Sequence, residues 1–390
     1  MKWEPPGHRF DVLVLGSGIA GATLAAHLSG RRKVAILERE LLLGSQTTGR
    51  SAAMFLPSYG GQKVRPLTRA SRGFFNAPPK GFDARILTPR AALHIARTAS
   101  LGKLHQLAAE LATARALTRE QARALVPILR PSSVAAGLLE TDAGDLDVAS
   151  LHSGFLRACR ETGGVTVADV GDVDIRRLGS LWRVRTGKGD FLAPVLVNAA
   201  GAWADATAQA AGLALKGLGP LRRTVLLTDP PAKPGFADWP TVKDINERFY
   251  FRPYSSSLLV TACDETPSPP CDAQADIFDV AYAVARFEFA TSQRVRRVNL
   301  RWAGLRTFAP DRAPVIGWSE EAEGFFWLAG LGGVGIQTSP AVGRLAASIL
   351  LRQPTPSDLI EHGVRPELYA PSRFRGAGSP VAVNADAVSG

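Results

Sequence analysis

The chain has 390 residues and a mass of 41.5 kDa, enough for two or three domains with separate cores. Hydrophobic residues make up 46% and charged residues 21%, and this ordinary globular usage excludes a disordered chain. The net charge of +11 is scattered, without a basic run interleaved with aromatic residues, so we expect no nucleic-acid partner.

Targeting and cysteine signals point to a reduced compartment. No apolar run of about 18 residues is present, and the segment Met1 to Phe10 lacks the apolar core of a signal peptide. Cys159, Cys263 and Cys271 are an odd number without C-x-x-C spacing, which argues against a disulfide framework and a zinc site. We therefore expect no metal and a cytoplasmic protein, with contact to the inner face of the membrane left open.

The N-terminal segment predicts a strand, glycine turn, helix and strand in that order. An aliphatic run from Arg9 to Leu15 leads into a glycine-rich turn, which is typical of a buried parallel strand. Ala22 to Leu28 reads as a helix that stops at Gly30, and Lys33 to Glu38 as a second strand.

The middle of the chain favours helices. Apolar residues spaced three and four apart predict helical structure from Ala91 to about Leu125. Thr118 to Gln121 forms a capping-box pattern within this stretch, and Asp147 is expected to cap a helix over Val148 to Glu161.

The remaining elements alternate between strands and one late helix. Residues 165–184 and 194–201 read as strands, and residues 222–260 as a mostly antiparallel layer of short strands. A buried strand over residues 325–329 precedes a glycine-rich turn and a helix to about Leu351. Residues 372–390 are expected to form a flexible tail.

The strongest local motif is Gly16-x-Gly18-x-x-Gly21 between a strand and a helix. Gly16 permits the tight turn, Gly18 the approach of a pyrophosphate, and Gly21 close helix packing. Glu38 ends the second strand, where a carboxylate can accept hydrogen bonds from ribose hydroxyls. The motif predicts a dinucleotide but does not choose between NAD and FAD.

Four further stretches resemble the FAD-dependent D-amino-acid oxidase family, which includes glycine oxidase and sarcosine oxidase. They are residues 48–53 (TGRSAA), 196–203 (LVNAAGAW), 302–306 (WAGLR) and 332–339 (GGVGIQTS), and the resemblance runs from about Phe10 to Glu367. Within the family the chain is most similar to bacterial D-amino-acid dehydrogenases of the D-arginine type. The resemblance implies FAD, bound non-covalently because no cysteine lies in the glycine-rich flavin segments.

The implied fold is α/β, with a Rossmann-like FAD-binding domain of the glutathione-reductase type and a second α+β substrate domain containing an antiparallel sheet. Residues 1–88, 145–212 and 313–371 would form the first domain, and residues 89–144 and 213–312 the second. The implied cofactor contacts are Gly16, Ser17, Gly18, Ile19, Ala20, Gly21, Glu38, Arg39, Thr48, Gly49, Arg50, Ser51, Ala52, Val170, Ala200, Gly201, Trp203, Arg306, Gly332, Gly333, Gly335, Ile336, Gln337 and Thr338. Val170 would offer backbone polar groups to adenine.

The resemblance also assigns a substrate site. A bidentate guanidinium that holds the substrate carboxylate matches Arg306 and, less clearly because Arg222 is its neighbour, Arg223. Tyr250 matches a tyrosine that helps to hold the carboxylate, and Tyr59, which precedes two glycines, matches a lid tyrosine. Gly333, Gln337 and Met54 match positions that line the pocket near the flavin.

Two positions depart from the D-arginine type. Met54 stands where that type has a histidine, and Ala92 aligns with a glutamate that holds a cationic side chain. Because both changes remove polar groups, we expect a preference for neutral, largely apolar D-amino acids.

The implied reaction is oxidative deamination of a D-amino acid to a 2-oxo acid and ammonia, by hydride transfer from the α-carbon to flavin N5. Secondary amines such as sarcosine, or 2-hydroxy acids, are an alternative on the same fold. A third alternative is a flavin-binding subunit that catalyses no reaction by itself. The electron acceptor, a quinone, another carrier or O2, and the oligomeric state are left open.

Overall fold

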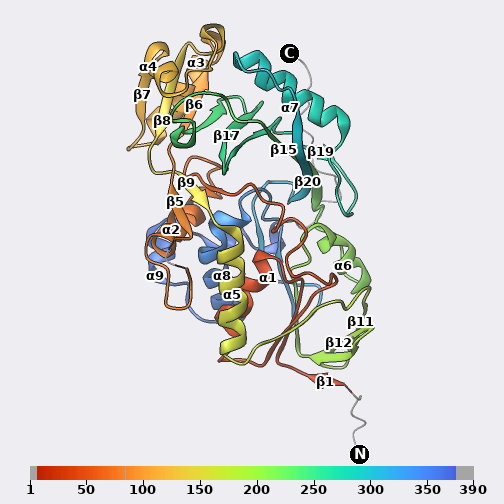
Figure 1. Cartoon of the computed structure of the whole chain (residues 1–390). Helices are drawn as coiled ribbons and strands as arrows, with labels where there is room; N and C mark the ends of the chain where they lie inside the picture. The colour runs from red at the N-terminus through yellow and green to blue at the C-terminus, as the bar shows by residue number, and fades with distance from the viewer. Residues whose placement is uncertain (1–6, 84, 375–390) are drawn as a thin grey trace, which may run out of the picture.

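The computed structural model describes residues 7–83 and 85–374, which form two lobes (Figure 1). The lower lobe in this view is built around a six-stranded sheet and the upper lobe around a nine-stranded sheet. Both sheets collect strands from distant parts of the chain, so the chain passes between the lobes several times.

The six-stranded sheet is parallel except for its last strand. Its middle strand β2 is buried at every position, because helices cover one face and a smaller sheet the other. In spatial order the strands are β10 (Val165–Val167), β3 (Val34–Leu37), β2 (Val12–Leu15), β14 (Val195–Asn198), β22 (Phe325–Ala329) and β21 (Val315–Trp318).

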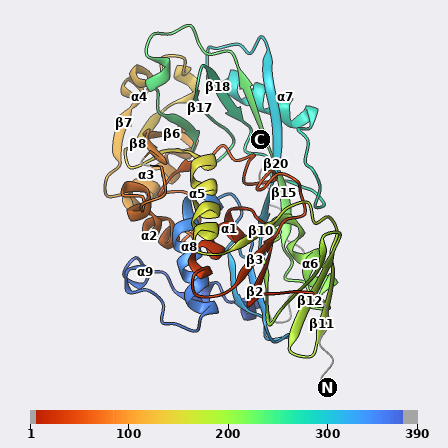
Figure 2. The same ribbon diagram turned by 60° about the horizontal axis from the view of Figure 1, so that its bottom comes forward.

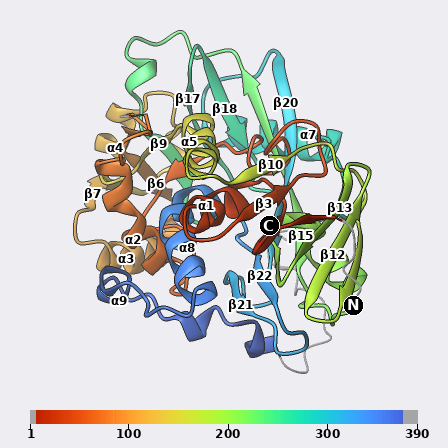
Figure 3. The ribbon, with the colours of Figure 1, turned by 90° about the horizontal axis from the view of Figure 1, so that it is seen from below.

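Helix α1 (Ile19–Leu28) contacts both α5 (Val148–Glu161) and α8 (Gly335–Leu350) on one face of this sheet. Figure 3 shows α1 and α8 side by side from below. A four-stranded sheet of β1 (His8–Arg9), β13 (Gly189–Ala193), β12 (Leu181–Thr186) and β11 (Asp174–Leu178) lies on the other side, packed through Trp182. The lobe also contains α2 (Arg65–Asn76), α6 (Ala204–Ala210) and α9 (Ser357–Glu361).

The nine-stranded sheet is antiparallel except where β16 pairs with β6. Its spatial order is β19 (Thr266–Pro267), β15 (Gly219–Thr228), β18 (Ser257–Thr261), β17 (Tyr250–Tyr254), β16 (Thr241–Asp244), β6 (Ala92–Ala96), β8 (Ala136–Glu140) and β7 (Arg115–Thr118), with β20 (Val298–Phe308) pairing with β15.

Helix α7 (Ile277–Ala290) packs on this sheet through Phe287, while α3 (Leu101–Glu110) contacts β6 and β8 and α4 (Arg119–Leu125) contacts β7 and β8. A small sheet of β4 (Met54–Phe55), β9 (Gly144–Leu146) and β5 (Leu87–Pro89) lies where the lobes meet. The predicted fold class is confirmed: an α/β lobe with a parallel sheet carries a second lobe with a largely antiparallel one.

Two predicted helix starts are confirmed in detail. Thr118 and Gln121 form a reciprocal capping box at the start of α4. Asp147 accepts a hydrogen bond from the Ser150 N–H at the start of α5. Both devices join residues three positions apart, so nothing distant is needed to specify them.

One local prediction is wrong, and a second is wrong for its first three residues. The stretch 91–125 is not helical throughout: strand β6 precedes α3, and strand β7 lies between α3 and α4. Strand β6 is buried at all five positions between β8 and β16, so it lacks the alternation that marks a half-exposed strand. Residues 372–374 belong to a 3₁₀ helix (Pro371–Phe374) in which Arg373 bonds to Asp311, and the rest of the predicted tail lies outside the described residues.

Candidate functional site

The glycine turn after β2 opens onto a large cavity. Gly16 has a φ of +104°, and a Cβ there would lie 2.5 Å from the carbonyl oxygen of Ala199. A Cβ on Gly21 would lie 2.0 Å from the carbonyl oxygen of Gly16, so close packing of the turn on α1 requires glycine at both positions. The N-terminal end of α1 faces the cavity, and the N–H of its first residue, Ile19, donates to the Thr48 hydroxyl at 2.9 Å.

Glu38 lies at the edge of the same cavity, at the end of β3. Its Oε2 accepts hydrogen bonds from the Ser17 N–H at 2.7 Å and the Ser17 hydroxyl at 2.6 Å, and its Oε1 accepts one from the Glu40 N–H at 3.0 Å. These bonds fix the carboxylate in place and leave it further acceptor sites on the cavity side.

The cavity has a volume of about 540 Å³ and takes its walls from both lobes. The residues implied by the resemblance that line it are Gly16, Gly18, Ile19, Ala20, Glu38, Arg39, Thr48, Arg50, Ser51, Ala52, Met54, Tyr59, Val170, Ala200, Gly201, Trp203, Arg223, Tyr250, Arg306, Gly332, Gly333, Gly335, Ile336 and Gln337. Those that do not line it are Ser17, Gly21, Gly49 and Thr338. Ser17 instead orients Glu38, and Gly21 supports the turn from behind.

The backbone N–H group of Val170 already has a partner. Its N–H donates to the carbonyl of Glu38 at 3.0 Å, so only its carbonyl oxygen has room for a further hydrogen bond. This long-range bond ties the segment after β10 to the end of β3.

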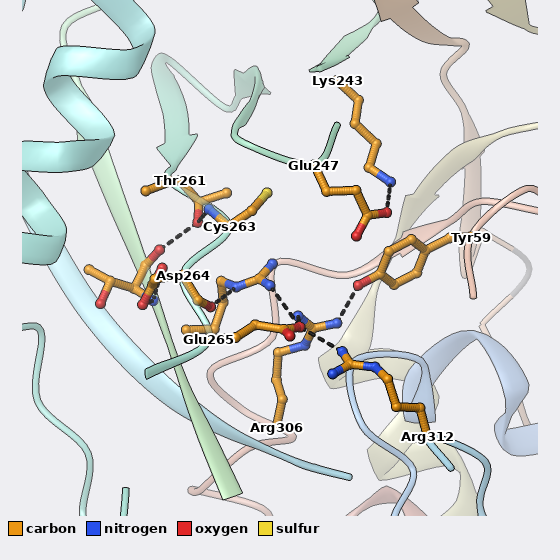
Figure 4. A network of polar contacts seen from close by, with 12 residues as sticks. Tyr59, Lys243, Glu247, Thr261, Cys263, Asp264, Glu265, Arg306 and Arg312 are labelled. Carbon is orange, nitrogen blue, oxygen red and sulfur yellow. Dashed lines mark hydrogen bonds and ion pairs between the residues drawn. The ribbon is translucent and has the colours of Figure 1, made fainter. Parts of the chain in front are cut away.

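Arginines gather at the upper-lobe end of the cavity (Figure 4). Arg306 on β20 and Arg223 on β15 both reach one carboxylate oxygen of Glu265, at 3.3 and 3.5 Å, and Arg312 reaches the same oxygen at 2.8 Å. Arg306 also donates to the Tyr59 hydroxyl. With Lys243, four cationic side chains at this end face the three carboxylates of Glu265, Glu247 and Asp264, which leaves a net positive charge for an anionic ligand.

The neighbouring Arg222 is not part of this end. It points to the other side of β15 and pairs with Asp279 on α7 at 2.8 Å, because successive side chains on a strand face opposite ways. Arg223 is the member of the pair that lines the cavity.

A charged pair on the wall was missed by sequence reasoning. Lys243 on β16 bonds to Glu247 at 2.7 Å, and its Nζ lies 4.5 Å from the centre of the Tyr59 ring. Burial opposes ionisation of Glu247, but the charges of Lys243, Arg223 and Arg306 outweigh it and hold its pKa below the ordinary value. In the sequence these residues look like a polar surface turn, and no motif marks them.

Tyr250 and Cys263 face the arginine end from β17 and from the segment after β18. Burial raises the pKa of the Tyr250 phenol and that of the Cys263 thiol, even though Arg223 lies close to both. Tyr250 therefore keeps its proton in the alkaline range and remains a hydrogen-bond donor.

The loop carrying Tyr59 is held from both lobes. The Leu56 N–H donates to the side chain of Gln337 on α8 at 2.9 Å, and the Ser58 N–H donates to Glu140 at 2.9 Å. Glu140 is 1% exposed, and its second oxygen bonds to His94 at 2.9 Å. A buried carboxylate–histidine pair thus sets the position of the loop, a feature that sequence spacing did not reveal.

Gly333 lies against the Arg306 guanidinium just before α8. A Cβ built on it would lie 1.7 Å from Arg306 Nη2, so only glycine leaves this group its place. Met54 also lines the cavity, whereas Ala92 does not: it is buried among Leu56, Ala143 and Tyr59.

The donor set suits an extended dinucleotide. Glycines keep the backbone open at Gly16 and Gly18, the N-terminal end of α1 supplies N–H groups, and a fixed carboxylate lies beyond them at Glu38. Among residues 7–83 and 85–374 no group of three or more His, Cys, Asp or Glu side chains is placed to hold a metal ion. No helix of the described ranges has both the length and the apolar character to cross a membrane.

A family model described as "FAD dependent oxidoreductase" matches residues 11–349. The chain therefore belongs to this family of FAD-dependent enzymes, and the predicted cofactor is confirmed at that level.

Among curated relatives, glycine oxidase of Geobacillus kaustophilus is 24% identical over 90% of this chain and 96% of its own length. Human mitochondrial sarcosine dehydrogenase is 23% identical over 91% of this chain but only 41% of its own length. The fold is similar to the crystal structure of that glycine oxidase, with a TM-score of 0.77 and 24% identity over 89% of this chain and 96% of that chain. It is also similar to the crystal structure of L-proline dehydrogenase from P. horikoshii, with a TM-score of 0.79 and 22% identity over 95% of this chain and 99% of that chain. The narrower resemblance to D-arginine dehydrogenases stays a prediction.

Proposed function

We propose that this protein oxidises the α-amine of a small amino acid, with D-amino acids as the first candidates. The observation that carries the proposal is the arginine pair Arg223 and Arg306 at the upper-lobe end of a cavity that begins, in the lower lobe, at a dinucleotide-binding turn. The choice of the D enantiomer rests on the resemblance of the sequence to D-amino-acid dehydrogenases.

FAD would lie along this cavity, with its adenosine near Glu38 and Val170 and its pyrophosphate at the N-terminal end of α1. The segments 48–52 and 332–338 would hold the flavin ring. When bound, FAD supplies the two-electron acceptor for the α-hydrogen and its bonding pair, which leaves an imine that water hydrolyses to a 2-oxo acid and ammonia.

The protein's own contribution would be positioning. Arg306 and Arg223 would hold the substrate carboxylate, and Tyr250, protonated because burial raises its pKa, would donate to the same group. The Tyr59 loop would cover the substrate. No side chain need act as a strong base, because an amine bound in its neutral form is already prepared to lose the α-hydrogen.

We propose that amino acids with neutral side chains are the preferred substrates. Met54 offers an apolar wall, and the charge of Glu247 is balanced by Lys243 at 2.7 Å, so the pair adds no net charge for a cationic or anionic side chain to seek. D-Alanine, D-leucine and D-proline are suitable probes, and D-arginine is the contrasting one.

A secondary amine is the second candidate. The similarity to sarcosine dehydrogenase and dimethylglycine dehydrogenase, 23% and 24% identical over about nine-tenths of this chain, favours an N-methylated glycine. The chain spans only 41% and 44% of those proteins, so their whole activity does not transfer directly.

The test is an anaerobic titration of the purified holoprotein, followed by its flavin absorbance. Bleaching by neutral D-amino acids at rates above those for sarcosine, glycine, 2-hydroxyglutarate and D-arginine supports the proposal. Faster bleaching by sarcosine supports the second candidate, and no bleaching by any of these compounds overturns both in favour of a non-catalytic flavin-binding subunit. Admission of air afterwards separates an oxidase from a dehydrogenase.

A further inference from the structure

Helix α7 presents apolar side chains on two opposite faces. One face packs into the core of the upper lobe through Val280, Ala283 and Phe287. The other carries Ile277, Phe278, Tyr282 and Phe289, which are 67%, 72%, 58% and 62% exposed. At about 100° per residue these four fall within an arc of about 140°, and Figures 1 and 2 show the helix on the outside of the lobe.

Such a face is not explained by the fold. Single exposed apolar side chains are ordinary, but four large ones on one side of one helix form a contiguous patch of the kind that marks an interaction surface. None of the four lines the cavity, so the patch is separate from the site described above.

Arginines are frequent in this helix and in the segment that follows it. Residues 277–301 contain Arg286, Arg294, Arg296, Arg297 and Arg301, against only the acidic residues Asp279 and Glu288. Asp279 is used on the buried side by Arg222, and Glu288 is paired with Arg294 at 2.6 Å. Arg296, Arg297 and Arg301 are exposed and make no ion pair within the part of the chain that the structure describes.

The register of the sheet places one of these arginines on the same side as the helix. Arg301 pairs with Leu226 across β20 and β15, and Leu226 belongs to the core beneath α7. Residues directly opposite each other in a ladder share a face, so Arg301 projects on the α7 side. Arg301 therefore lies on the α7 side of the sheet, and Arg296 and Arg297 lie exposed in the segment that joins α7 to β20.

We infer that this surface, Ile277, Phe278, Tyr282 and Phe289 with Arg296, Arg297 and Arg301, docks on an anionic phospholipid membrane. Aromatic and aliphatic side chains on one helix face suit the boundary between headgroups and acyl chains, and arginines beside them suit acidic headgroups. A two-fold contact between copies of this chain is the competing occupant of the patch, and light scattering distinguishes it from lipid binding. The inference is independent of the proposed substrate.

Sedimentation with phospholipid vesicles tests it, using the FAD-loaded full chain. The protein should sediment with vesicles of phosphatidylcholine mixed with phosphatidylglycerol, remain free with phosphatidylcholine alone, and be released by high salt. The double variants F278S/F289S and R296E/R297E should each lower the bound fraction about tenfold or more. The matched control Leu215→Ser, which removes an exposed apolar side chain elsewhere, should bind as the wild type does.

Each variant should keep its FAD spectrum and the wild-type turnover, because none of these residues lines the cavity. Binding that is absent with phosphatidylglycerol, or that survives both double variants, overturns the inference. So does light scattering that shows a dimer in the wild type, a monomer in F278S/F289S and no lipid binding in either, because the patch then belongs to a second copy of the chain.

Discussion

Replacing Gly333 by alanine should displace the Arg306 guanidinium and lower activity without unfolding the protein. The new Cβ would lie 1.7 Å from Arg306 Nη2, 2.1 Å from Nε and 2.2 Å from Cζ. Since ordinary van der Waals contact begins at 3.4 Å, Nη2 must retreat by about 1.7 Å, the difference between 3.4 and 1.7 Å. The atoms that move are the far end of a flexible side chain, so the backbone has no need to shift.

The expected loss follows from that displacement. A misplacement of about 1 Å in a positioning group costs on the order of 100-fold in rate, so kcat/KM should fall at least about 100-fold, or about 2.7 kcal/mol of transition-state stabilisation. The free energy of unfolding should change by less than about 1 kcal/mol, because a glycine-to-alanine change also reduces the entropy of the unfolded chain.

The assay is steady-state kinetics with the best substrate from the titration, together with urea unfolding and the Kd for FAD. Gly102→Ala is the matched control: Gly102 lies in α3, and a Cβ added there would meet nothing within 4 Å, so the kinetics of this variant should equal those of the wild type. A Gly333→Ala protein that binds FAD normally and retains kcat/KM within about threefold would refute the view that Arg306 holds the substrate carboxylate in this place.

Three further changes test other parts of the site and the fold. Arg306→Met should lower kcat/KM by about 1,000-fold, because a buried charge-assisted pair is worth about 2–5 kcal/mol. Arg306→Lys should retain part of the lost activity, and equal kinetics of the two variants would count against bidentate binding of the carboxylate. Glu140→Gln should raise KM several-fold with a smaller change in kcat, since the Tyr59 loop loses a charged anchor at Ser58, and an unchanged KM would show that the loop is held without it. Burial, with Arg344 and Arg31 nearby, lowers the pKa of His27 from 6.5 to about 4. Between these pH values the unfolded chain binds a proton that the folded chain does not, so the free energy of unfolding should fall by about 3 kcal/mol as the pH falls from 6.5 to 4. His27→Gln should flatten this part of the urea-unfolding profile, and an unchanged slope would contradict it.

Short-range features of this protein could be predicted from the sequence. The glycine motif from Gly16 to Gly21, the capping box at Thr118 and the cap at Asp147 are each patterns of residues within a few positions of one another, although the close contact at Gly16 is with Ala199. The resemblance of longer stretches added the family, the cofactor and a set of site residues, most of which line the cavity.

Other charged residues at the upper-lobe end of the cavity could be found only from the tertiary structure. Lys243, Glu247 and Glu265 carry no motif, because they act together only after β16, the turn beyond it and the segment after β18 have been brought beside β20. The buried pair Glu140 and His94 is hidden for the same reason, since its partners lie on two paired strands 46 positions apart.

Two adjacent arginines show the division most simply. Composition and spacing cannot distinguish Arg222 from Arg223, yet one pairs with Asp279 under α7 and the other lines the cavity. The alternation of side chains along β15 separates them, and which side is which is decided only when α7 packs on one face of the sheet and the lower lobe closes on the other.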